Sequence, residues 1–298
     1  MHKYFYTIMV SLKGMYKQSG VFSNLLLLLG TAVFFAVMAI GVWKVFFGAN
    51  PTEINSVRWL QFAQSIGMFV VPPLVLAYFW SDNPFKYLCL DKKPGLGNVL
   101  FVILFMVLVI PFINLLGDWN QQLKLPHALG AIEAQMKVSE AEIALLTEKM
   151  LDVHSLQGLT ANIFLIAFIP ALGEELFFRG ALQQIFQNKK NAILAIWITA
   201  FIFSAIHCQF YGFVPRFLLG AFFGYLLVWS GNLWLPILAH FTNNAVAIVF
   251  YYLKHNGFQV LDIDSIGTGS TLWAGYACGV LALIMIVLLR KLFRANFL

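Results

Sequence analysis

Long apolar stretches separated by short polar segments dominate this chain. Each runs for about 17 to 28 residues, the length an α-helix needs to cross roughly 30 Å of hydrocarbon. We therefore expect an all-α, polytopic membrane helix bundle with about eight transmembrane helices. The predicted spans are roughly 22–47, 61–80, 98–116, 160–187, 191–210, 213–229, 232–253 and 271–289.

The spans divide the chain into three regions. Residues 1–159 form an N-terminal three-span region with a long outer loop, and residues 160–253 form a four-helix core. Residues 254–298 hold the last span and a tail. Only the middle region combines apolar spans with a set of ionisable side chains, so we expect the chemistry of the protein there.

The long outer loop, about 117–159, contains a helical pattern. Ser139 and Glu142 have the spacing of a capping box, and apolar residues then recur on one helical face. This predicts a short amphipathic helix on the outer leaflet. Two interpretations stay open: a solvated loop with a packed helix, or a lid that controls substrate access.

Four prolines lie inside predicted spans, at 72, 73, 111 and 170. A proline inside a helix removes a backbone donor and opens the helix one turn earlier. Pro170 stands four residues before Glu174, so we expect a kink that widens the bundle beside this carboxylate.

Composition and charge agree with a membrane location. The 298 residues are 60% hydrophobic and only 11% charged, whereas soluble domains carry about 25% charged residues. When the connections are assigned alternately to two sides, most Lys and Arg residues fall on the side of both termini. Both termini are thus predicted to be cytoplasmic, in a multi-pass protein of a bacterial inner membrane. The cations on that side are Lys3, Lys13, Lys17, Lys86, Lys92, Lys93, Lys189, Lys190, Arg290, Lys291 and Arg294.

The formal charge of +6 indicates contact with anionic lipid headgroups. No basic stripe interleaved with aromatic residues runs along a polar segment, so we predict membrane lipids as partners and no nucleic acid. The three cysteines are isolated from one another, which predicts no disulfide framework.

Two adjacent glutamates, Glu174 and Glu175, lie inside the fourth span with Arg179. On a helix Glu175 and Arg179 share a face and can form an ion pair, whereas Glu174 points about 100° away. An ionisable group in hydrocarbon is costly unless it is paired or hydrated, which favours a functional role. The alternative is an ion-pair network at a helix end. The apolar segment continues through Phe186, which places Glu174 about 20 Å from the inner helix end.

Two later spans each contribute a histidine, His207 and His240, and Asn244 lies one helical turn after His240. One histidine on a membrane helix is usually a packing residue, but these side chains and Glu174 form a convergent polar set. Asn243 is predicted to point elsewhere and to serve packing.

These residues resemble those of a known family. Glu-Glu-Leu-Phe-Phe-Arg at 174–179 is similar to the Glu-Glu-x-x-x-Arg motif of the CAAX protease and bacteriocin-processing family, the Abi family of intramembrane endopeptidases. Phe203 with His207 is similar to its Phe-x-x-x-His motif, and His240 with Asn244 to its His-x-x-x-Asn motif. This family includes the type II prenyl-protein proteases.

The resemblance implies that Glu174 and His207 activate water, that Glu175 and Arg179 support them, and that His240 and Asn244 stabilise the oxyanion. It implies no cofactor, although Glu174, His207 and His240 could bind zinc with an open position. The His-Glu-x-x-His helix of many metalloproteases is absent.

The expected function is hydrolysis of a peptide bond in a membrane-associated, prenylated or leader-bearing protein or peptide. Two other classes stay open. The first is a non-enzymatic membrane scaffold or bacteriocin-immunity and regulatory protein of the same family. The second is a proton-coupled transporter that uses Glu174 and His207 as a relay, but the spans show no obvious two-fold repeat.

Overall fold

The computed structural model describes residues 12–47, 53–187 and 191–295, and every regular element in these ranges is a helix. The N-terminal half contains α2 (Val21–Phe47), α3 (Ile54–Gln64), η1 (Ser65–Val70), α4 (Val71–Trp80), α5 (Pro84–Tyr87), α6 (Leu96–Leu108), α7 (Ile110–Gln121), η2 (His127–Leu129) and α8 (Gly130–Leu151). The C-terminal half contains α9 (Leu156–Asn162), η3 (Ile163–Phe168), α10 (Ile169–Glu175), η4 (Leu176–Leu182), α11 (Gln183–Gln187), α12 (Ala192–Ala205), η5 (Phe210–Gly212), α13 (Phe213–Ser230), α14 (Trp234–His255), η6 (Ile263–Ser265), η7 (Gly269–Thr271) and α15 (Leu272–Ala295).

The prediction of an all-α, polytopic membrane helix bundle is confirmed. Within the described ranges, five helical segments are long and apolar enough to cross a membrane, and α6 with α7 makes a sixth if this pair, bent by 41°, is one span. The chain is an integral multi-pass membrane protein. The five segments are Val21–Phe46, Ile54–Trp80, Leu156–Gln187, Phe210–Ser230 and Gly269–Phe293.

Helices also occupy the other two predicted spans, but neither meets both criteria. The apolar helix α12 has 14 residues, which gives about 21 Å at 1.5 Å per residue and is less than the hydrocarbon thickness. Helix α14 is long enough, but it carries several polar side chains. The number of spans supported by length and composition is therefore five or six, compared with the eight expected from the sequence.

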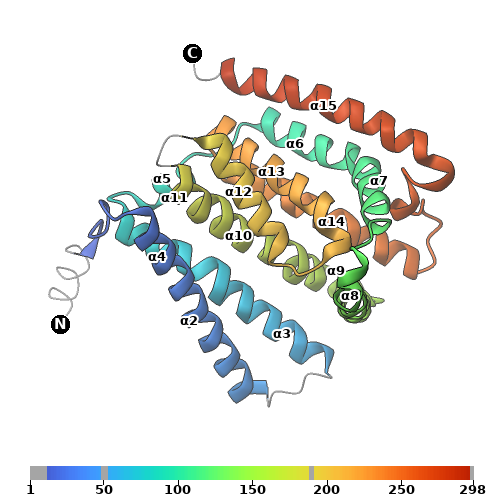
Figure 1. Cartoon of the computed structure of the whole chain (residues 1–298), viewed down its shortest axis with the longest axis horizontal. Coiled ribbons are helices and arrows are strands. Elements are labelled where there is room, and N and C mark those ends of the chain that lie inside the picture. The colour runs from blue at the N-terminus through green and yellow to red at the C-terminus, as the bar shows by residue number, and fades with distance from the viewer. Residues whose placement is uncertain (1–11, 48–52, 188–190, 296–298) are drawn as a thin grey trace.

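The helices pack as a layered bundle in which distant segments meet (Figure 1). α2 packs against α3, α12 against α13, α14 against α6, and α15 against α7. Phe105 of α6 stacks on Phe222 of α13, with ring centroids 4.4 Å apart, inside the apolar core that joins α6, α13, α14 and α15. On the outer surface, large apolar side chains such as Phe22 and Val45 are exposed, as expected of helices that face lipid.

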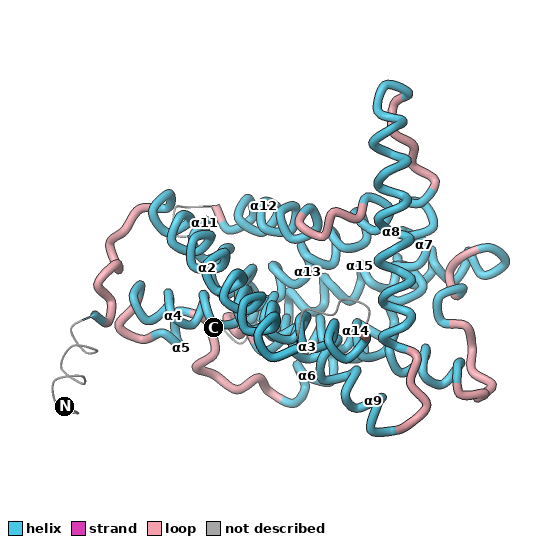
Figure 2. Tube along the Cα trace, turned by 90° about the horizontal axis from the view of Figure 1, so that it is seen from below, coloured by secondary structure: helices cyan, strands magenta, loops and turns pink. Residues whose placement is uncertain are grey.

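Helix α8 lies across the bundle. Figure 1 looks along its axis, whereas Figure 2, turned by 90°, shows it lengthwise and projecting beyond its neighbours. It contacts α3, α9 and α14. The predicted helix in this loop exists, but its predicted start is wrong: α8 begins at Gly130, after the short helix η2, so Ser139 and Glu142 lie in its interior.

Among the described residues of the spans, three segments are π-helical: η1, η3 and η4. η1 immediately precedes the turn that contains Pro72 and Pro73, and η3 ends two residues before Pro170. Pro111 lies at the bend between α6 and α7. Because proline cannot donate to the preceding turn, a wider turn or a bend is expected at each site, and one occurs beside each of these prolines. The kink expected at Pro170 stays a prediction.

The predicted membrane orientation is not tested by the fold. Lys3, Lys189 and Lys190, which contribute to it, lie outside the described residues. The assignment of both termini to the cytoplasm therefore stays a prediction.

Candidate active site

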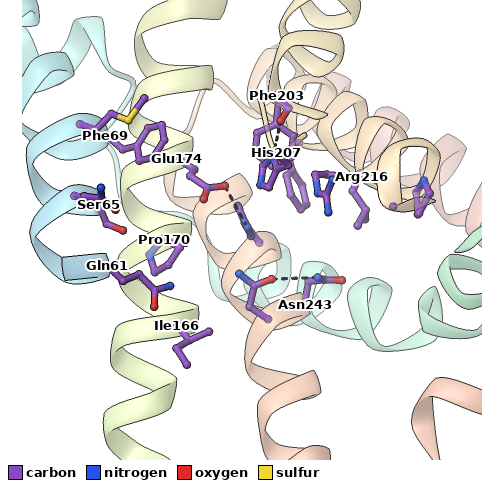
Figure 3. A pocket seen from close by; sticks show the side chains of 18 of the residues that line it. Gln61, Ser65, Phe69, Ile166, Pro170, Glu174, Phe203, His207, Arg216 and Asn243 are labelled. Carbon is purple, nitrogen blue, oxygen red and sulfur yellow. Dashed lines mark hydrogen bonds and ion pairs between the residues drawn. The ribbon is translucent and has the colours of Figure 1, made fainter. Parts of the chain in front are cut away.

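A cavity of about 700 Å³ lies among the helices that carry the predicted site residues (Figure 3). Its walls come from α2, α3, η1, η3, α10, α12, α13 and α14 and from the segment between α12 and α13. Glu174, His207, His240 and Asn244 all line it. Four of the six predicted site residues therefore share one cavity, although they come from three separate parts of the chain.

The two glutamates have different environments. Glu175 is fully buried, whereas the side chain of Glu174 is 16% exposed and lines the cavity. Adjacent residues on a helix point about 100° apart, so one carboxylate faces the interior and the other faces the cavity. The predicted separation of their directions is observed.

Arg179 lies behind the cavity and has no exposed surface. Its Nη1 donates to Glu175 Oε1 at 2.8 Å, and its Nη2 donates to the carbonyl of Gly220 at 2.9 Å. The guanidinium also packs over the ring of Phe203, 4.6 Å from the centroid. The ion pair expected from the i,i+4 spacing is present, and it is a buried pair rather than an exposed network at a helix end.

His240 connects this ion pair to the cavity. Its Nδ1 lies 2.9 Å from Glu175 Oε1, and its Nε2 lies 3.9 Å from Glu174 Oε2. The first distance is that of a hydrogen bond and the second is longer than one, so Nε2 stays available to a ligand. The ring stacks on Phe223 with centroids 5.3 Å apart, which restricts its orientation.

His207 is held differently. It follows α12, and its Nδ1 lies 2.7 Å from the carbonyl oxygen of Phe203. A carbonyl oxygen only accepts, so Nδ1 carries the hydrogen and Nε2 of the neutral ring has a free lone pair. Figure 3 shows the His207 ring across the cavity from the helix that carries Glu174.

Asn244 and its neighbour Asn243 both line the cavity. Asn243 Nδ2 donates to Asn244 Oδ1 at 3.2 Å, which leaves the amide nitrogen of Asn244 free to donate to a ligand. The prediction that Asn243 points elsewhere and serves packing is therefore wrong. Both residues lie in the regular helix α14, and the cavity is wide enough for two side chains about 100° apart to line it.

Four polar residues of the cavity were not predicted from the sequence. Gln61, Gln64 and Ser65 line the wall formed by α3 and η1, and Arg216 lines the wall formed by α13. The sequence could have indicated Arg216 as a site residue, because it is a cation in the apolar stretch from 213 to 229. The three residues on α3 and η1 gave only a weak signal because uncharged polar residues are common near span ends.

The possible zinc ligands do not form a metal-binding group. No set of three or more His, Cys, Asp or Glu side chains in the described ranges is arranged to hold a metal ion. The site therefore does not fit zinc bound by Glu174, His207 and His240, and we derive no step through a metal.

Sequence comparisons identify a family for this part of the chain. Residues 156–246 match the model of the type II CAAX prenyl endopeptidase Rce1-like family. The chain is also similar to the uncharacterized protein YpbD of Bacillus subtilis (strain 168), with 29% identity over 89 residues. That alignment covers 28% of this chain and 43% of YpbD, so the chain spans under half the length of that relative. No solved structure matches the chain.

The matched segment runs from the start of α9 into α14 and contains Glu174, Glu175, Arg179, His207, His240 and Asn244. It also contains η3 and η4, the two π-helical segments that flank the glutamates. The expected family is thus found at the residues that suggested it: residues 156–246 form a domain of the type II CAAX prenyl endopeptidase Rce1-like family.

Proposed function

We propose that this protein is an intramembrane endopeptidase of the glutamate type, which hydrolyses a peptide bond in a membrane-associated, prenylated or leader-bearing protein or peptide. One observation carries the proposal: Glu174, His207, His240 and Asn244 line a single cavity, with the Glu175–Arg179 pair buried behind it. The family of residues 156–246 supports peptidase chemistry.

In this mechanism Glu174 and His207 activate the attacking water. Glu174 is a carboxylate on the cavity wall, and His207 presents the Nε2 lone pair left by the bond of Nδ1 to Phe203. As the water oxygen bonds to the peptide carbonyl carbon, its proton passes to one of these bases. When the carbon–nitrogen bond breaks, the same proton is delivered to the leaving amine.

His240 and Asn244 stabilise the negative charge that forms on the carbonyl oxygen. Because Nδ1 of His240 is bonded to Glu175, Nε2 donates a hydrogen bond to the oxyanion when the ring is an imidazolium. The free amide nitrogen of Asn244 is the second donor. Donors held in place before the reaction cost no reorganisation during it.

Glu175 and Arg179 are positioning residues. Glu175 Oε1 accepts from both Arg179 and His240, so the orientation of the His240 ring depends on the buried ion pair. Arg179 is in turn tied to α13 through the Gly220 carbonyl. The pair thereby connects α10, α13 and α14 at the level of the cavity.

The direct test is peptide mass spectrometry of membranes that contain the wild-type protein, Glu174→Gln, or the control Glu142→Gln. Glu142 is exposed on α8, away from the cavity, so this control also removes one carboxylate. We expect new peptide ends with the wild type and the control, and their loss with Glu174→Gln at equal protein abundance. A scaffold would keep its phenotype in all three, and unchanged peptide ends would refute the proposal.

A further inference from the structure

Arg216 is a cation that the proposed mechanism does not use. It lies in the first turn of α13 and lines the cavity. Figure 3 shows it beside His207, across the cavity from the helix that carries Glu174. A charged side chain in an apolar part of a membrane protein is costly, so its partners need to be identified.

Arg216 is held in place from one side only. Its Nη2 donates to Gln209 Oε1, in the segment that joins α12 to α13. Gly212 leaves space for the guanidinium, because a Cβ at this position would lie only 3.1 Å from Arg216 Nη2. The backbone at Gly212 therefore lies closer to the guanidinium than a residue with a side chain would readily allow.

The other side of the guanidinium has no partner. Nη1 of Arg216 is buried and makes no hydrogen bond, and none of the ion pairs among the described residues includes Arg216. The carboxylates that act on its charge, Glu174 and Glu140, do so from beyond ion-pair distance. Glu140 instead accepts from the backbone nitrogen of Tyr211.

Arg179 and Arg216 differ in the partners of their guanidinium groups. Both guanidiniums lie beside the same cavity, but Arg179 has a carboxylate and a carbonyl at hydrogen-bond distance. A partly buried cation without a counter-charge is unfavourable, and a planar guanidinium can bind a carboxylate through two parallel hydrogen bonds. Arg216 therefore has the features of a cation whose anionic partner belongs to a ligand.

We propose that Arg216 binds a carboxylate of the substrate, and thereby positions the peptide relative to Glu174. This inference rests on the proposed function, and it narrows the substrate class to peptides with a carboxylate near the cleaved bond. Two sources share this chemistry: the free C-terminus of a substrate that ends inside the cavity, and an Asp or Glu side chain.

The test measures binding separately from cleavage. Glu174→Gln protein in lipid nanodiscs is titrated with fluorescent prenylated peptides of one sequence, as the C-terminal acid, the C-terminal amide, and the amide with an internal Glu or the matching Gln. A hydrogen-bonded charge pair predicts roughly 10- to 100-fold tighter binding of the carboxylate peptide. Adding Arg216→Gln should reduce this ratio to about 1.

Arg290→Gln is the matched control, because Arg290 is exposed on α15 and does not line this cavity. It should keep the full acid-to-amide ratio, and Arg216→Lys should keep part of it because it retains the charge. Preference for the C-terminal acid identifies a chain end as the ligand, and preference for the internal Glu peptide identifies a side chain.

The inference is overturned if no carboxylate peptide binds, or if the preference survives in Arg216→Gln. Cleavage of the same peptides by the protein with Glu174 intact is measured in parallel. Binding that depends on Arg216 without any cleavage would refute the proposed function and leave the carboxylate site in place. Cleavage without a preference for carboxylate peptides would refute the carboxylate site and leave the proposed function in place.

Discussion

Replacement of Arg179 by methionine tests whether the buried ion pair supports the site. The change removes the only arginine or lysine within 4 Å of Glu175 among the described residues, and it removes the bond to the Gly220 carbonyl, which lies in the interior of α13 and also accepts within that helix. Breaking a buried pair costs about 3–5 kcal/mol, and a lost hydrogen bond to a charged group costs about 1.5–3 kcal/mol. The two contributions overlap, so we expect a loss of about 4 kcal/mol in the free energy of unfolding.

The double variant Glu175→Gln/Arg179→Met separates the pair from its role at the site. It has no uncompensated buried carboxylate, so the remaining defect is the lost hydrogen bond between Arg179 and the Gly220 carbonyl, and stability should recover to within about 1–2 kcal/mol of the wild type. The amide oxygen introduced by Glu175→Gln can still accept from His240 Nδ1, but a neutral acceptor holds the ring less strongly than a carboxylate does. Peptide hydrolysis should therefore stay low in the double variant although it is folded.

The assay is titration with sodium dodecyl sulfate, with helicity followed by circular dichroism, and hydrolysis measured on the same samples. A single-variant loss under about 1 kcal/mol would show that the pair is not stabilising in the folded state. A double variant that is as unstable as the single one would also contradict the reasoning, since the uncompensated Glu175 charge would then not be the cause.

Three further predictions follow from other parts of the structure. In Gly67→Ala, a Cβ would lie 2.8 Å from the Phe35 carbonyl oxygen, so α2 should be displaced from η1 and the protein destabilised by about 1–3 kcal/mol in the same titration. In Glu133→Gln, α8 should loosen, because Glu133 binds Leu125, Lys137 and Tyr211; a spin label on α8 should become more mobile. A chelator should leave hydrolysis unchanged, because no three-ligand metal group occurs in the described ranges.

The Glu133 contacts also predict a pH effect with a defined sign. The Lys137 ammonium, the Leu125 amide and the Tyr211 hydroxyl lower the pKa of Glu133 from 4.5 to about 2. A lowered pKa means that the ionised form stabilises the docked state, so this contribution is complete above about pH 4.5 and is lost as the pH falls towards 2. The spin label on α8 should therefore be insensitive to pH between about 7 and 5 and gain mobility below about 4 in the wild type. The same pH response in Glu133→Gln would contradict this assignment.

Local patterns in the sequence predicted the features that depend on one helix. The Glu175–Arg179 pair follows from i,i+4 spacing, and the irregular turns beside Pro72 and Pro170 follow from the missing amide hydrogen of proline. The polar residues of three spans were expected to converge because each is costly alone in hydrocarbon.

Local sequence patterns do not predict the features that depend on contacts between helices. Nothing in the sequence indicates that Glu175 Oε1 is shared between Arg179 and His240, because that contact requires α10 and α14 to pack together. Arg216 is an isolated cation in the sequence, and only the folded chain shows that it lines the cavity. The start of α8 was misplaced because a capping-box spacing also occurs inside helices.

The π-helical turns have a consequence for insertions and deletions. A π-helical turn holds one more residue than an α-helical turn, so η3 and η4 each contain a residue that a regular α-helix would omit. Deleting one residue from η4 would let the segment relax to α-helix, and the helix on either side should keep its present orientation because the wide turn already absorbs the extra residue. The same deletion in the regular helix α14 would rotate one side by about 100° relative to the other. The π-helical segments are therefore the places in the spans where a one-residue change in length can be accommodated locally.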